Sequence, residues 1–121
     1  MKQLLVIGLM FFFLFPACTN QYKVPSGIIP KEKMEKILWD MIVADRYVTS
    51  FLSKDTTLNL QEQALSMYEQ VFTLNKITKD EFAKSMKFYL ERPDISKVML
   101  DSLSAKANRL REEMYKTGAP L

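Results

Sequence analysis

Apolar residues recur every three or four positions from Met34 to Met114, and no stretch alternates between apolar and polar residues. A repeat near 3.6 residues is typical of amphipathic α-helices, whereas half-buried strands repeat every two residues. The sequence therefore predicts an all-α domain without strands. The positions that define the repeat are Met34, Ile37, Leu38, Met41, Val48, Leu52, Leu60, Ala64, Val71, Phe72, Phe82, Met86, Tyr89, Leu90, Ile95, Met99, Leu103, Leu110 and Met114.

Proline, glycine and capping residues divide this repeat into a small bundle of about four helices. The first helix is expected from Pro30 to Leu52, because proline is tolerated in a first helical turn. A polar loop follows. Asn59 then has the position of an N-cap, with Glu62 three residues later as in a capping box. The second helix is expected to run from there to about Leu74.

The start of the third helix has the most complete local signal in the chain. Thr78 is expected to be its N-cap and Glu81 its capping-box partner, while Ile77 and Phe82 have the spacing of a hydrophobic staple. Pro93 then ends this helix, because a proline disfavours the α conformation in the residue before it. The fourth helix is expected over residues 93–116, before a glycine and another proline.

The first seventeen residues have the order of a bacterial secretory signal peptide. Lys2 precedes an apolar run over residues 4–15, and Ala17 offers a small residue at the cleavage point. Cys18, which follows directly, is what the lipoprotein pathway acylates, so we expect residues 1–17 to be removed and Cys18 to carry diacylglyceryl and palmitate chains. The alternative is an ordinary cleaved signal peptide followed by a chance cysteine, although the bulky Phe15 suits ordinary signal peptidase poorly.

The mature chain is expected to be anchored to a membrane without crossing it. The apolar run of about a dozen residues is shorter than the roughly 20 that a spanning helix needs. Residues 18–29 are polar and broken by proline and glycine, which predicts a lipidated tether before a helical domain at 30–117. Because no acidic run follows Cys18, we expect the protein at the periplasmic face of the outer membrane.

Composition argues against most enzyme classes. The chain has no histidine and one cysteine, so the commonest general base and metal ligand are missing. With Cys18 lipidated, no thiol remains for disulfides, metal binding or catalysis. A net charge of +3 is too small and too scattered to favour nucleic acid binding. We therefore expect a protein that is not an enzyme, with no cofactor and no bound metal.

Several short motifs follow one another in a distinctive order. They are Val-Pro-Ser-Gly-Ile-Ile-Pro at 24–30, Lys33-Met34, Asp40, Ala44-Asp45, Tyr-Glu-Gln-Val-Phe at 68–72, Ile77-Thr78, Glu81-Phe82, Ser85-Met86, Tyr89, Pro93 and Val98. Their order resembles an uncharacterised family of small Bacteroidota lipoproteins, domain of unknown function 4296, over about residues 24–112. The resemblance implies a lipid-anchored helical protein and implies no activity.

Asp45 and Ser85 are the candidates for a buried polar lock. At 100° per residue Asp45 falls between Met41 and Val48, near the centre of the apolar face of the first helix. A carboxylate there needs a partner, because an unpaired buried charge costs several kcal/mol. The expected partners are Ser85, Tyr68, Tyr89 or a helix amino end. The alternatives are a proton-handling or ligand-binding role for Asp45, and a role for Ser85 in close helix packing.

Trp39 lies off the apolar stripe of the first helix, so it is either covered by another element or exposed as a contact for a partner. The six methionines after Cys18 either fill irregular gaps in the core or line an adaptable peptide groove. The charged segment 106–114 either projects from the bundle to recognise a partner or is a solvated terminal helix.

These patterns favour a non-enzymatic interaction or assembly factor. The alternative is a periplasmic chaperone-like module that binds peptides, and an enzyme ranks third. A groove with methionines or Trp39 exposed favours the chaperone, and a closed core with one flat apolar patch favours a scaffold. An open pocket with two convergent carboxylates favours an enzyme.

Overall fold

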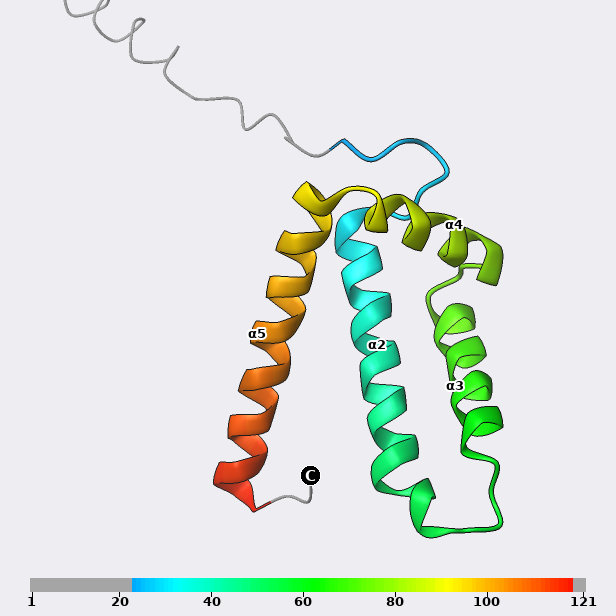
Figure 1. Cartoon of the computed structure of the whole chain (residues 1–121), viewed down its shortest axis with the longest axis vertical. Helices are drawn as coiled ribbons and strands as arrows, with labels where there is room; N and C mark the ends of the chain where they lie inside the picture. The colour runs from blue at the N-terminus through cyan, green and yellow to red at the C-terminus, as the bar shows by residue number, and fades with distance from the viewer. Residues whose placement is uncertain (1–22, 119–121) are drawn as a thin grey trace, which may run out of the picture.

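The computed structural model describes residues 23–118, and over this range it contains four α-helices, one short 3-10 helix and no strand (Figure 1). The predicted all-α class is therefore confirmed. The signal peptide and Cys18 lie outside the described residues. The elements are α2 (Lys31–Ser50), η2 (Leu52–Lys54), α3 (Leu60–Leu74), α4 (Lys79–Leu90) and α5 (Pro93–Thr117).

The predicted helix starts agree with the structure to within one residue, and local capping side chains are present at α3 and α4. The Thr78 hydroxyl accepts a hydrogen bond from the backbone N–H of Glu81 at 3.1 Å, and the Glu81 carboxylate accepts one from the Thr78 N–H at 2.7 Å. This is the complete capping box. At α3, the Asn59 side chain accepts from the N–H groups of Gln61 and Glu62. The first helix ends at Ser50, two residues earlier than predicted, and Leu52–Lys54 forms the 3-10 turn.

The helices are arranged around α2. In Figure 1, α3 runs antiparallel to α2 on one side, α5 runs in the same direction as α2 on the other, and α4 crosses one end. The core contains residues from the first halves of α2 and α5, from the end of α3 and from α4, so it lies at the end that α4 crosses. Its buried members are Ile29, Met34, Ile37, Val71, Phe72, Tyr89, Ile95, Met99 and Leu103.

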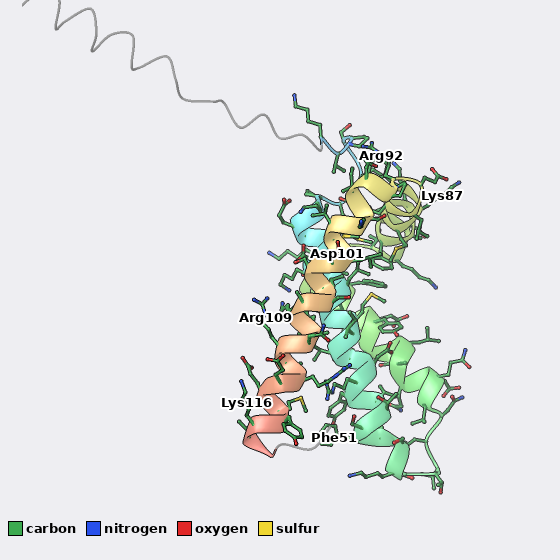
Figure 2. All side chains as sticks on the ribbon, turned by 60° about the vertical axis from the view of Figure 1, so that its left-hand side comes forward. Phe51, Lys87, Arg92, Asp101, Arg109 and Lys116 are labelled. Carbon is green, nitrogen blue, oxygen red and sulfur yellow. The ribbon has the colours of Figure 1, made fainter. Side chains whose placement is uncertain are left out.

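The last turns of α5 stand away from α2 in Figure 1. Leu110 and Met114 are half-buried there, whereas most of the charged residues around them are exposed. Figure 2 shows this C-terminal half of α5 from another side, with Arg109 and Lys116 labelled on it. The segment 106–114 therefore projects from the bundle, which is one of the two arrangements that its sequence allows.

The segment before α2 is packed as part of the domain. Pro25 to Ile28 form a turn closed by the Ile28 N–H and the Pro25 carbonyl at 3.2 Å, with Gly27 at φ +84° as a type II turn requires. Ile29 follows and is buried in the core. The sequence analysis predicted a tether through residue 29, and this is wrong for Ile29. Two isoleucines within a polar segment that contains proline have no periodicity from which burial can be predicted.

Candidate functional site

Ser85 and Tyr89 of α4 hold the backbone of Ile29 from both sides. The Ile29 N–H donates to the Ser85 hydroxyl at 2.9 Å, and the Tyr89 hydroxyl donates to the Ile29 carbonyl at 2.7 Å. Ser85 is 0% exposed, and its hydroxyl donates in turn to the Glu81 carbonyl. Burial, with a smaller contribution from the charge of Glu32, raises the pKa of Tyr89. Ser85 is thus a buried polar residue, as predicted, with Ile29 as its partner.

Asp45 is exposed, so the expectation that it is buried is wrong. Its carboxylate accepts a hydrogen bond from the Tyr68 hydroxyl of α3 and makes no contact with Ser85. This bond, together with burial of the phenol and the negative charge of Asp45, raises the pKa of Tyr68 to about 12. The error has a positional reason: Asp45 belongs to the second half of α2, whereas α4 crosses the end where α2 begins (Figure 1).

Trp39 is half-buried, and the ammonium nitrogen of Lys106 lies 4.3 Å from its ring centroid. Lys106 belongs to α5, so the last helix partly covers the indole. This agrees with the first of the two alternatives for Trp39, cover by another element. The same ring borders a hollow of about 500 Å³ between α2 and α3. Val43, Tyr47 and Leu74 line this hollow and are exposed.

A polar bridge between α2 and the end of α3 was not predicted. Asn75 is buried; its amide nitrogen donates to Asp40 at 3.1 Å, and its amide oxygen accepts from Lys36 at 3.0 Å. Burial alone raises the pKa of Asp40, but the hydrogen bonds from Lys36 and Asn75 outweigh it and hold that pKa below its usual value. The left-handed residue after α3 is Lys76, at φ +51°, and no local pattern at Asn75 indicates a partner 35 residues away.

An apolar groove of about 460 Å³ lies where α2, α3 and α4 meet. Phe72 and Phe82 form part of its lining, with ring centroids 5.0 Å apart. The groove extends along the whole of α4 and along two turns of α3. The full lining is Met41, Leu65, Tyr68, Glu69, Phe72, Lys79, Phe82, Ala83, Met86, Lys87 and Leu90.

The groove is open, because large apolar side chains at its edges are exposed. Leu90 is 73% exposed and Leu65 is 53% exposed. Two lysines of α4, Lys79 and Lys87, and one acid of α3, Glu69, are the charged residues of the lining. A larger hollow of about 570 Å³ lies between residues 23–28 and the start of α2, but its lining mixes lysine, glutamate and serine with a few apolar residues. The apolar groove is therefore the stronger candidate for a binding site.

A family model for "Domain of unknown function (DUF4296)" matches residues 25–113 of the chain. The chain belongs to the DUF4296 family. In the two other comparisons, no curated protein and no solved structure matches it. The matched region begins in the turn before Ile29 and ends within α5, so it contains the Ile29 contacts, the polar bridge and the groove.

The described part of this DUF4296 protein has no group of three or more histidine, cysteine, aspartate or glutamate residues placed to hold a metal ion. Within residues 23–118, no helix is long and apolar enough to cross a membrane. Met34 and Met99 fill the core, while Met41 and Met86 line the groove and Met67 lines the hollow beside Trp39. Methionines of this DUF4296 protein therefore both fill the core and line the groove.

Proposed function

We propose that this protein is a non-enzymatic, lipid-anchored protein of the bacterial envelope that binds another protein as an interaction or assembly factor. The observation that carries the proposal is the open apolar groove, lined mainly by methionine, phenylalanine and leucine. A monomeric domain rarely leaves such a surface uncovered, and concave apolar sites with few charged groups are typical of binding sites.

The sequence of the first eighteen residues supports the lipid anchor. A charged start, an apolar run and a small residue precede Cys18. Only residues 19–22 separate Cys18 from Lys23, so the anchor lies within about 17 Å of the described domain. The domain therefore stays close to the lipid headgroups. The lack of an acidic run after Cys18 supports the periplasmic face of the outer membrane, and the motif order supports a Bacteroidota lipoprotein.

The way the domain uses its polar residues supports a non-enzymatic role. Ser85 and Tyr89 bond to the backbone of Ile29, and Asn75 bonds to Asp40 and Lys36. Ser85, Tyr89 and Asn75 thus contribute to the fold and line none of the three hollows described above. The 121 residues of the sequence include no histidine, which is the commonest acid–base catalyst.

The alternative is a periplasmic chaperone-like module that binds peptide segments. Met41 and Met86 in the groove favour this alternative, because methionine side chains adapt to apolar partners of different shape. A chaperone binds many partners through the groove, whereas an assembly factor binds one or a few. The number of partners captured at the groove therefore distinguishes the two functions.

The anchor is tested with Cys18→Ser. The variant should lose palmitate labelling and move from the membrane to the soluble fraction, because the thiol that receives the lipid is removed. Fractionation after a carbonate wash measures the change. A variant that remains in the washed membranes contradicts the anchor.

Binding at the groove is tested by placing a photo-crosslinking residue at Leu90 or Leu65 in cells and identifying the captured protein and the crosslinked peptide. Tyr115, which is 89% exposed on α5 and far from the groove, is the matched control. We expect capture at the two groove positions and not at the control. Equal capture at all three positions, or capture at the control alone, contradicts the proposed function.

A further inference from the structure

The groove favours a partner segment that is already helical. Its lining consists of side chains from three helices, and the backbone groups within those helices are already hydrogen-bonded to each other. An extended peptide in this groove finds no sheet edge to pair with, so its own N–H and C=O groups lose water without gaining partners. A helical segment satisfies these groups internally and presents only side chains.

The dimensions of the groove fit a short helix. Along α4 the lining runs from Lys79 to Leu90, which corresponds to about 16 Å at 1.5 Å per residue. A helical segment of about three turns covers that length and presents apolar residues at steps of three and four. Ala83 lies midway between the two lysines of α4, so a partner side chain can approach the helix closely there.

The charges of the lining are sorted by helix. Lys79 and Lys87 lie on α4, eight residues or about 12 Å apart, and Glu69 lies on α3. Both lysines are exposed, and neither forms an ion pair with another residue of the described part. The α4 side of the groove is thus basic and the α3 side acidic. A partner helix with acidic residues seven or eight apart on one edge matches the α4 side.

We propose that the groove binds an amphipathic helical segment of another protein, with its apolar face in the groove and an acidic edge along Lys79 and Lys87. This inference rests on the proposed function and specifies the chemistry of the partner. Apolar burial supplies most of the affinity, because it excludes water from the phenylalanines and methionines. The exposed lysines set the orientation and the charge preference of the partner.

The test uses two synthetic 14-residue helical peptides with the same leucine face. One carries glutamates at positions seven apart along one edge, and the other carries lysines at those positions. Fluorescence anisotropy measures the binding of each peptide to the full mature chain with Cys18→Ser, which keeps the protein in solution. The variant Lys79→Glu with Lys87→Glu reverses the edge. Lys97→Glu with Lys116→Glu, on exposed lysines of α5, is the control with the same net charge.

We expect the glutamate peptide to bind the parent protein about tenfold more tightly than the lysine peptide, because two exposed ion pairs change together. The preference should invert in the groove variant and persist in the control. Circular dichroism and thermal unfolding verify that the variants fold.

Equal binding of the two peptides, or an unchanged preference in the groove variant, overturns the inference. Self-association that Leu90→Glu abolishes also overturns it, since a second copy then fills the groove. The same holds if phosphatidylglycerol vesicles protect the Leu90 side chain from oxidative labelling and the glutamate peptide does not. If crosslinking at Leu90 still captures a protein in these cases, the proposed function stands without this partner chemistry. Loss of both results rejects both proposals.

Discussion

Replacing Ser85 by alanine tests the contact that closes the N-terminal segment onto α4. The Ser85 hydroxyl is fully buried and is the acceptor for the Ile29 N–H at 2.9 Å. Ser85→Ala leaves that buried donor without a partner, which costs about 1–3 kcal/mol. Alanine recovers about 0.5 kcal/mol through its higher helix propensity. We therefore expect a net loss of about 0.5–2.5 kcal/mol in the free energy of unfolding.

The assay is urea unfolding of the mature chain with Cys18→Ser. A loss of this size lowers the midpoint by about 1 M, given the slope usual for a domain of this length. Ser66→Ala is the matched control, because Ser66 is exposed within α3 and the same gain in helix propensity applies there. If Ser85→Ala and Ser66→Ala shift the midpoint equally, the hydrogen bond to Ile29 does not stabilise the domain and the reasoning fails.

Tyr89→Phe extends the test, because it removes the bond to the Ile29 carbonyl without removing the ring. Both bonds hold Ile29, so the loss of one lets Ile29 move and weakens the other hydrogen bond. The double variant with Ser85→Ala should therefore lose less than the sum of the single losses. A strictly additive double variant shows that the two contacts act independently.

Two further predictions concern single hydrogen bonds. Thr78→Ala should remove the cap bond of α4 and lower the free energy of unfolding by about 1 kcal/mol, and an unchanged midpoint in denaturant refutes the cap. The pKa of Tyr68 is raised, so its bond to Asp45 stabilises the fold below pH 10 and is lost as the pH rises through about 12. Asp45→Asn should return the pKa of Tyr68 toward 10. A phenolate absorbance titration measures this pKa once the curve of a Tyr68→Phe protein is subtracted, and an unchanged pKa refutes the contact.

The sequence predicted those parts of the fold that depend on neighbouring residues. The capping box of Thr78 and Glu81 and the proline at the start of α5 act within four residues of themselves, so their pattern is sufficient to place a helix boundary. The all-α class followed from the period of the apolar residues, and the number of helices followed from the proline, glycine and capping residues that divide the repeat. The end of the first helix was misplaced by two residues because a 3-10 turn continues the same apolar spacing.

The site was less predictable, because it depends on how whole helices are placed. The burial of Ser85 was foreseen from its helix face, but its bond to Ile29 spans 56 residues. Asp45 has the periodicity of a core residue, but the residues of α2 in the core, Met34 and Ile37, belong to the first half of that helix and Asp45 is exposed in the second. The groove itself arises from the angle between α3 and α4, which no local pattern specifies. Leu90 belongs to the predicted apolar stripe of its helix and Leu65 does not, yet both are exposed at the edges of the groove.

The contacts of Ile29 also determine when this domain can finish folding. They join residues 56 and 60 positions apart, among the longest separations in the domain. A chain made at 5–20 residues per second exposes Ile29 roughly 3–12 s before Tyr89 exists. Closing so long a loop carries an entropic cost that local helix formation avoids. The helices can therefore form as they emerge, while the end of the domain nearest Cys18 is the first part to be synthesised and the last to be fixed in place.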